Sequence, residues 1–224
     1  MTKKYFAAAL ILFVSIETGL AQPLAAEAIT PALKSDAPQA NLPRCVDSEV
    51  DIAEIRRVQK ANDKTSHKYD GYRKALHADT DLELAARLAY AETLAANCQQ
   101  QEDQVATLIS GVIGNRVRIR RGDVAGVVFQ RNQFSSSLNI YPESRYRNFL
   151  CPDNDGLWKK TAAQVRANLE APKQGEPIPR DAVNYYLYRH SNRFESVVWR
   201  LEEVPVTDDK TRECIRVFRD SGWK

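Results

Sequence analysis

The sequence lacks the residue patterns that bind metals. Its three histidines have neither the i, i+4 spacing nor the nearby carboxylates of a metal-binding motif; they are His67, His77 and His190. The four cysteines include no CxxC pair. We therefore expect no metal and no other cofactor, and we interpret the histidines as surface residues.

A strong charge of either sign is also missing. The formal net charge is +3 at pH 7, which is too small to indicate a nucleic-acid partner. Basic residues do cluster in residues 116–121, but they alternate with apolar residues. We interpret this cluster as the solvated end of a helix, where the helix dipole favours cations.

The chain has no apolar run of about 20 residues, the length that a transmembrane helix needs. The apolar segment at residues 5–16 is shorter, follows Lys3 and Lys4, and precedes a small-x-small pattern at residues 19–21. These features predict a signal peptide over residues 1–21 and a periplasmic or secreted protein. A retained N-terminal anchor is the alternative.

The number and spacing of the cysteines are consistent with export. They are even in number and widely separated, at Cys45, Cys98, Cys151 and Cys214. In an oxidising compartment this pattern predicts two disulfides. The three possible pairings cannot be distinguished from the sequence.

Residues 22–45 are rich in alanine and proline and have no helical or strand period, so we expect a flexible linker before a folded domain at residues 46–224. Apolar periodicity in that domain predicts helices over residues 48–62, 82–92, 104–117 and 155–169, and short strands within residues 182–188, 196–200 and 213–219. Helices followed by a small C-terminal sheet predict an α+β fold in which helices dominate.

Capping residues indicate where two of these helices begin. Ser48 is the expected N-cap of the first helix, and Thr80, with Glu83 three residues later, predicts a capping box for the second. The apolar face of the first helix is expected to contain Val50, Ile55 and Val58.

Two glycines interrupt the helix at residues 104–117. Gly111 and Gly114 each cost about 1 kcal/mol relative to alanine in a helix. We expect them to permit the close approach of a neighbouring backbone, with the helix that carries Glu92 as the candidate neighbour.

Glu92 is the candidate catalytic residue. Leu84 and Leu88 lie on the apolar stripe of its helix, and at 100° per residue Glu92 projects from the shoulder of that stripe. Partial desolvation there is expected to raise the pKa of the carboxyl, as a general acid requires. The alternative is an ordinary helical glutamate that reaches solvent or pairs with Arg116.

Four short motifs follow one another along the chain: Leu88-Ala89-Tyr90-Ala91-Glu92; Gln104-Val105-Ala106 leading into Gly114-Asn115-Arg116-Val117; residues 124–130; and Gln133-Phe134-Ser135. Their order and spacing resemble the cell-wall hydrolases of the spore-cortex-lytic type. The resemblance implies a lysozyme-like domain that cuts the glycan strand of peptidoglycan, in several members as a lytic transglycosylase. It places the catalytic glutamate at Glu92.

The segment after Glu92 departs from the family pattern. Members usually continue with a short glycine-containing turn and a second glutamate, whereas residues 93–103 are longer here and contain Cys98. Glu102 and Asp103 are the candidates for a second carboxylate.

The resemblance also implies residues that bind sugar. Gln133 and Ser135 are expected to hydrogen-bond sugar hydroxyls or N-acetyl groups, and Phe134 is expected to hold their loop. Four further candidates, for which packing or helix capping is the alternative role, are Tyr90, Tyr185, Tyr186 and Asn115.

Two functions are consistent with these features. The first is an exported enzyme that cleaves peptidoglycan between N-acetylmuramic acid and N-acetylglucosamine, as a lytic transglycosylase with Glu92 as its single acid and base. The second is a non-catalytic peptidoglycan-binding or scaffolding protein of the bacterial envelope on the same fold, which the altered turn after Glu92 favours.

Overall fold

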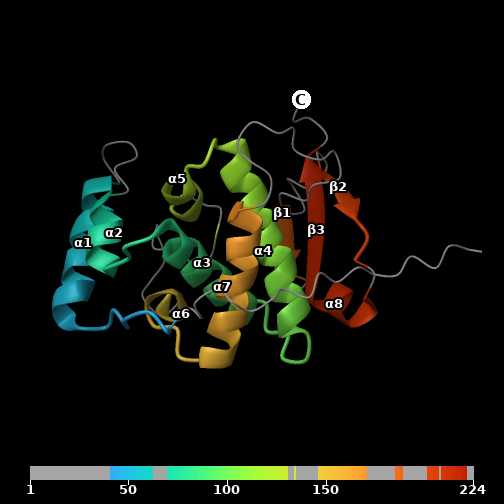
Figure 1. Ribbon diagram of the computed structural model, residues 1–224, viewed down its shortest axis with the longest axis horizontal. Helices are drawn as coiled ribbons and strands as arrows, with labels where there is room; N and C mark the ends of the chain where they lie inside the picture. The colour runs from blue at the N-terminus through green and yellow to red at the C-terminus, as the bar shows by residue number, and fades with distance from the viewer. Residues whose placement is uncertain are drawn as a thin grey trace, which may run out of the picture. The chain divides into compact units, whose positions relative to one another are not determined.

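The computed structural model describes residues 41–62, 70–130, 134, 146–170, 185–188, 201–206 and 208–220, all within one compact unit (Figure 1). Eight helices and three strands occur among these residues. They are α1 (Glu49–Asn62), α2 (Asp70–Leu76), α3 (Asp81–Ala95), α4 (Glu102–Ile119), α5 (Val124–Val128), α6 (Arg147–Leu150), α7 (Asp155–Glu170), β1 (Tyr185–Tyr188), β2 (Leu201–Val204), α8 (Asp209–Cys214) and β3 (Ile215–Asp220). The predicted α+β class with dominant helices is confirmed.

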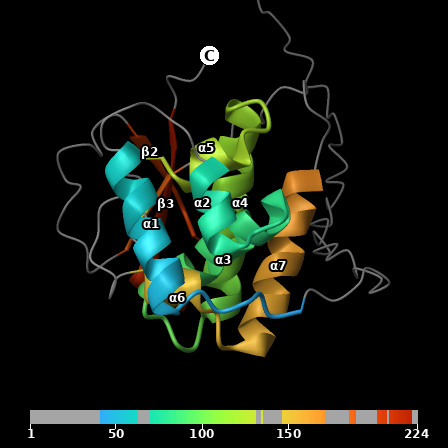
Figure 2. The same ribbon diagram turned by 90° about the vertical axis from the view of Figure 1, so that its left-hand side faces the viewer.

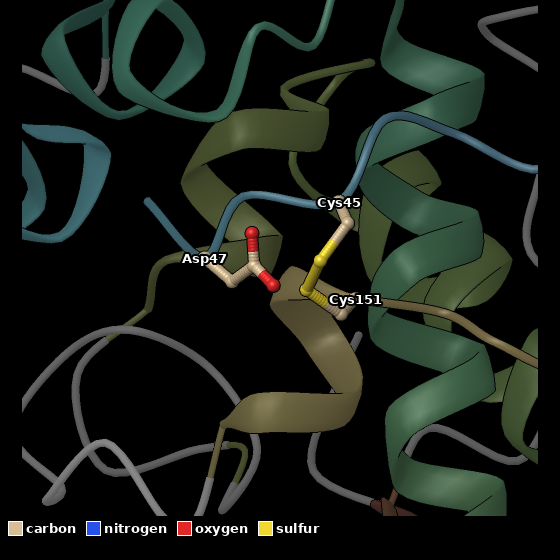
Figure 3. Close-up of side chains that lie close together, drawn as sticks. All are labelled: Cys45, Asp47 and Cys151. Carbon is tan, nitrogen blue, oxygen red and sulfur yellow. A yellow bond between two sulfur atoms is a disulfide. The ribbon is translucent and has the colours of Figure 1, made fainter. Parts of the chain in front are cut away.

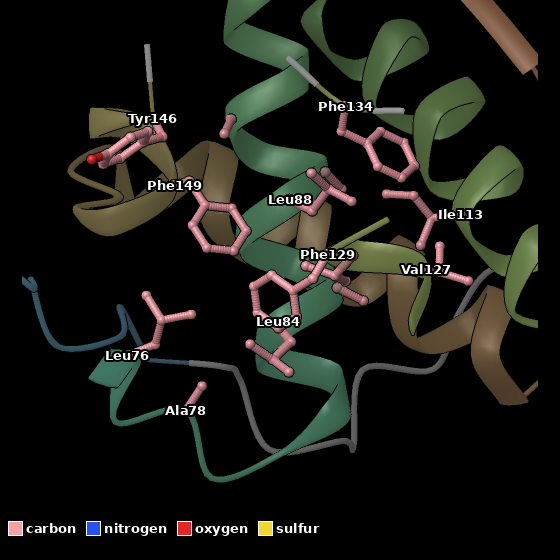
Figure 4. Packing of buried hydrophobic residues seen from close by; sticks show 14 of the residues in the cluster. Leu76, Ala78, Leu84, Leu88, Ile113, Val127, Phe129, Phe134, Tyr146 and Phe149 are labelled. Atoms are coloured by element: carbon pink, nitrogen blue, oxygen red, sulfur yellow. The ribbon is translucent and has the colours of Figure 1, made fainter. Parts of the chain in front are cut away.

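Helix α3 is the centre of the unit. Every residue from Leu84 to Thr93 is buried, and α4, α5, α6 and α7 all pack against it (Figure 1). One side contributes Leu84 and Leu88 to the main core, beside aromatic residues from α6 and from the end of α5 (Figure 4). The opposite side packs on α7 through a second cluster formed by Ala86, Tyr90, Leu157, Trp158 and Ala162. The prediction of a single apolar stripe was therefore wrong, because α3 is enclosed rather than amphipathic.

The capping predictions for α1 and α3 are confirmed at their N-caps. The Ser48 hydroxyl accepts a hydrogen bond from the backbone N–H of Asp51 at 3.2 Å, and the Thr80 hydroxyl accepts one from Glu83 at 3.1 Å. The Glu83 carboxylate accepts from Arg87 in α3.

Helices α1 and α2 pack against each other (Figure 2). The sequence did not predict α2, which is short and polar. Tyr72 of α2 stacks on Phe129 with ring centroids 4.6 Å apart and so joins the pair to the core. Val50 is 79% exposed, so its predicted place on the apolar face of α1 was wrong; Ile52 is buried instead.

The C-terminal strands form an antiparallel sheet in the order β1-β3-β2. Tyr186 of β1 lies opposite Val217 of β3, and Val204 of β2 lies opposite the same residue from the other side. Figure 1 shows α4 between α3 and this sheet. The strand predicted within residues 196–200 lies outside the described residues.

Both disulfides predicted from the cysteine count are present. Cys45 pairs with Cys151 and Cys98 with Cys214, and no described cysteine is free. The first joins the chain before α1 to the chain after α6 (Figure 3), and the second joins the α3–α4 turn to the α8–β3 junction. Among the described residues, no helix combines the length and apolar character that crossing a membrane requires.

A buried arginine also binds the chain before α1. Arg87 in α3 has no exposed surface, and its guanidinium donates to the carbonyl oxygens of Arg44, Phe149 and Leu150 at 2.7, 3.1 and 2.7 Å. It also donates to the Glu83 carboxylate at 3.0 Å. Burial lowers the pKa of Arg87 from its ordinary value, and the Glu83 carboxylate opposes this effect.

The two glycines of α4 differ in their surroundings. A Cβ at Gly114 would lie 2.8 Å from the Cβ and 3.0 Å from the carbonyl oxygen of Asn168, whereas a Cβ at Gly111 would meet no atom within 4 Å. The predicted close approach is therefore real at Gly114, but its partner is α7 rather than α3. The prediction for Gly111 was wrong.

We expect Gly114→Ala to lower the free energy of unfolding by about 1–3 kcal/mol, because α7 must move away. Gly111→Ala, the matched control in the same helix, should raise it by about 0.5–1 kcal/mol through helix propensity alone. Urea unfolding measures both, and equal effects of the two substitutions would contradict the proposed α4–α7 contact.

Arg87→Met should lower the free energy of unfolding by roughly 3–5 kcal/mol, because buried carbonyl oxygens lose their donor. Thermal and urea unfolding at neutral pH test this. Arg57→Met is the control, since Arg57 pairs with Glu54 on the surface of α1. A loss no larger than that of the control would show that Arg87 does not hold the segments together.

Candidate functional site

Glu92 lies in the last turn of α3, and only 1% of its surface is exposed. It follows Leu88 by one helical turn on the same side of the helix. Its carbonyl oxygen accepts the backbone N–H of Ala96 at the C-cap. The side chain also has an interaction partner in the structure. The sequence placed this carboxyl on the shoulder of an apolar stripe; the structure instead encloses it.

Phe134 is anchored in the core beside α3. It is 2% exposed and lies beside Leu88 and Ile113 (Figure 4). The Arg116 guanidinium lies over its ring, 4.9 Å from the centroid, in a cation–π contact. The Phe134 ring, which lies beside Leu88, is thus about one helical turn from Glu92 along α3. Gln133 and Ser135, its predicted sugar-binding neighbours, lie outside the described residues.

Asn115 is buried in α4, and its amide oxygen accepts a hydrogen bond from Arg118 one turn later. This contact links two polar side chains of the same helix. It gives Asn115 a local structural role, whichever of its two predicted roles applies.

Tyr90 has a structural role that the sequence did not reveal. Its ring is fully buried and meets Trp158 edge-on at 6.2 Å. Its hydroxyl accepts the backbone N–H groups of Asp153 and Asn154 at 3.2 and 3.0 Å and donates to the Asp153 carboxylate at 2.9 Å. Burial raises the pKa of Tyr90. The ring has no exposed face for a sugar, and the hydroxyl has no remaining hydrogen-bonding capacity.

Tyr185 and Tyr186 begin β1, where they lie opposite Phe218 and Val217 of β3. This confirms their place in a strand. Their proposed contact with sugar stays a prediction.

The candidates for a second carboxylate lie in the first turn of α4. Asp103 forms an ion pair with Lys160 of α7, with N–O distances of 2.8 and 2.9 Å. Glu102 is half-buried at the start of the helix, where the dipole favours an acidic residue. The Lys160 contact gives Asp103 a role in joining α4 to α7.

Asp51 and Glu92 are the two acidic residues that are buried in the described part of the chain. Asp51 accepts hydrogen bonds from His77 at 3.0 Å and Ser48 at 2.7 Å, and Arg44 lies 3.2 Å away. The His77 contact is the main cause that lowers the pKa of Asp51, followed by Ser48. Structural contacts therefore account for the burial of Asp51.

One cluster has the residue types of a metal site. Potential ligand atoms of Cys45, Asp47 and Cys151 lie within 4.8 Å of one another (Figure 3). The two sulfurs are bonded to each other, however, and a metal binds the thiolate form of cysteine. In this oxidised form the cluster offers a metal only the Asp47 carboxylate.

Comparisons with protein-family models, with curated proteins and with solved structures found no match for this chain. Its function is therefore inferred from its own residues and from the motifs around Glu92.

The buried Asp51 predicts a pH dependence of stability. Because its pKa is lower in the folded state, its contribution is present above the ordinary value of 3.8 and disappears as the pH falls through the lowered value. Asp51→Asn should therefore lower the melting temperature at pH 7, with the difference from the wild type becoming smaller as the pH falls below 3.8. Melting curves from pH 2 to 7 test this. Glu213→Gln, at an exposed site, is the control, and a pH-independent difference for Asp51→Asn would contradict the assignment.

Proposed function

We propose that this protein is an exported enzyme that cleaves the glycan strand of peptidoglycan, with Glu92 as its acid and base. The observation that carries the proposal is a carboxyl side chain only 1% exposed within the central helix. The motif resemblance assigns the catalytic role to the same residue. The two disulfides agree with an oxidising compartment outside the cytoplasm.

A carboxylate in this position is expensive to maintain. Removing an ionised carboxylate from water costs several kcal/mol even after local relaxation, and an apolar side chain would fill the space without that cost. Buried, energetically unfavourable ionisable groups occur often at functional sites. This supports a chemical role for Glu92.

The reaction that suits one carboxyl group is lytic transglycosylation. Hydrolysis ordinarily uses two carboxyl groups on either side of the glycosidic bond. In transglycosylation the C6 hydroxyl of N-acetylmuramic acid attacks its own C1, so the nucleophile is already tethered to the reacting centre. Glu92 donates its proton to the leaving oxygen and then accepts the proton of the C6 hydroxyl. The engagement of Asp103 with Lys160 favours this single-carboxyl scheme over hydrolysis.

The Phe134 anchor supports the proposed site. Arg116 and Ile113 of α4 and Leu88 of α3 lie around its ring, so Phe134 contacts both helices that carry the motifs. We propose that Gln133 and Ser135 bind the sugar there, and that Tyr185, Tyr186 and Asn115 are further contacts.

Peptidoglycan binding without cleavage is the second candidate. The altered turn after Glu92 favours it, and a general acid must also come within hydrogen-bonding reach of the leaving oxygen, whereas Glu92 is 1% exposed. An enzyme must therefore expose this carboxyl when substrate binds, whereas a binding protein need not.

Glu92→Gln should lower the rate of muropeptide release by about 10²–10⁴-fold while folding and wall binding persist, because the amide cannot supply the proton. Mass spectrometry of the products from purified cell walls gives both the rate and the chemistry. Anhydro-muramyl ends are expected, and reducing ends would indicate hydrolysis.

Glu102→Gln and Asp103→Asn are the controls and should have mild effects. Loss of release in either control, with retention in Glu92→Gln, would move the acid to that residue. A wild type that binds walls without releasing muropeptides would establish the non-catalytic alternative.

A further inference from the structure

The C-terminal end of α4 has an unusual residue in its left-handed position. Gly122 donates its N–H to the carbonyl of Val117 at 2.8 Å, and Arg121 donates to Arg118 at 2.9 Å, which together define a Schellman motif. The residue in the left-handed position of this motif is usually glycine. Here it is Arg121, with φ 56°, although Gly122 is the next residue.

The other non-glycine residues with a left-handed conformation are of types that commonly adopt it. Among the described residues, His77 and Asn97 also have a positive φ without being glycine. Histidine and asparagine are enriched in this conformation, and His77 gains a hydrogen bond to Asp51. Arginine has no such preference. Its presence at position 121 therefore needs another reason, since a strained residue is often kept for function.

The helix dipole alone does not require this arrangement. Cations are favoured throughout the last turn of a helix, and Arg116 and Arg118 already occupy that turn in relaxed helical geometry. Arg120 and Arg121 are exposed, and neither forms an ion pair with any residue in the described part of the chain.

The acidic residue that follows Arg121 most closely in the sequence is Asp123, and it accepts a hydrogen bond elsewhere. Asp123 caps α5, where its carboxylate accepts the N–H of Gly126 at 2.7 Å. Arg118 donates to Asn115, which is neutral. Two exposed arginines, Arg120 and Arg121, thus lie where α4 meets α5 (Figure 1), with Asp123 as the acidic residue that follows them in the sequence.

This charged end adjoins the Phe134 anchor. Arg116 and Arg120 are four residues apart and so share one face of α4. Since Arg116 lies on the Phe134 ring, the exposed arginines continue from the motif that is proposed to hold the sugar. A ligand that contacts the Phe134 side of α4 would therefore lie on the same face of the helix as Arg120.

We propose that the exposed pair Arg120 and Arg121 forms a binding surface for the carboxylate groups of the peptide stems of peptidoglycan. This rests on the proposed function, because it takes the glycan as the ligand. Guanidinium groups match carboxylates with two parallel, charge-assisted hydrogen bonds. The stems carry carboxylates at intervals along the glycan, so both arginines at one helix end can bind at once. The surface thereby selects peptide-bearing strands over bare ones.

Binding is best measured with the full chain carrying Glu92→Gln, so that the wall is not consumed. In this background, Arg120→Gln/Arg121→Gln should raise the dissociation constant for purified sacculi roughly tenfold in co-sedimentation assays. Lys60→Gln/Arg147→Gln removes the same charge from exposed sites elsewhere and should change it less than about twofold. Equal effects of the two double variants would overturn the proposal.

The source of the carboxylates is tested by removing the stems with an amidase and then amidating the lactyl carboxylate that this hydrolysis leaves on each muramic acid. Binding by the chain with intact arginines should then fall to the level of the Arg120→Gln/Arg121→Gln variant. Undiminished binding to the stripped glycan would overturn the proposal. Binding that depends on the arginines and is abolished by inorganic polyphosphate, but not by removal of the stems, would also overturn it.

Arg121→Gly separates binding from folding. Glycine relaxes the left-handed position, so the melting temperature should rise by about 2–4 °C while binding weakens. A lower melting temperature together with weaker binding would assign Arg121 to stability and overturn its role in binding.

The assays also separate this inference from the proposed function. If the wild type releases muropeptides but its binding does not depend on Arg120 and Arg121, the role of the arginines is refuted and the proposed cleavage is not. If binding depends on both the stems and the arginines but no muropeptides are released, the proposed cleavage is refuted and the role of the arginines is not.

Discussion

The fold depends on one buried guanidinium. Arg87 reaches from the middle of α3 to carbonyl oxygens on two other segments, the chain before α1 and the end of α6. An isolated charge at this depth would be strongly unfavourable, so the three segments must assemble together around it. The Cys45–Cys151 disulfide joins the residues next to those carbonyls and so fixes the same junction covalently.

This junction gives α3 its rigidity. The helix is fixed near its middle by Arg87, and Tyr90 ties the next turn to the start of α7. Glu92 follows half a turn later. A carboxyl group held on such a helix has little freedom to move, as a proton donor with fixed geometry requires. The same rigidity implies that access to Glu92 must come from its surroundings rather than from α3.

Much of the fold followed from local patterns. Apolar periodicity predicted α1, α3, α4 and α7, and the N-caps at Ser48 and Thr80 were correct, because these features depend on neighbours in the sequence. Helix α2 was missed because it is too short and polar to have a clear period. The error at Val50 has a different origin: at 100° per residue, Val50 lies about 140° from Ile55 around α1, so the two residues cannot share a narrow apolar face.

The candidate site was less predictable because its contacts are long-range. The motifs selected Glu92, but nothing in the sequence indicated that Tyr90 would bond residues 153 and 154 or that Arg87 would reach Arg44. The disulfide pairing and the α7 partner of Gly114 likewise depend on tertiary packing. A glutamate four residues before an arginine in a helix predicts a surface ion pair. The spacing of Glu83 and Arg87 is the pattern that the sequence offers here, and it does not indicate that Arg87 is buried.

The position of the Cys45–Cys151 bond has a mechanical consequence. The cysteines are 106 residues apart, and the chain between them contains α1 to α6, including Glu92. Tension applied between the chain before Cys45 and the chain after Cys151 passes through the sulfur–sulfur bond and bypasses that loop. Tension between the chain just before Cys45 and the chain shortly after Cys151 therefore does not load the helix that carries Glu92, which would suit the proposed action on a load-bearing polymer.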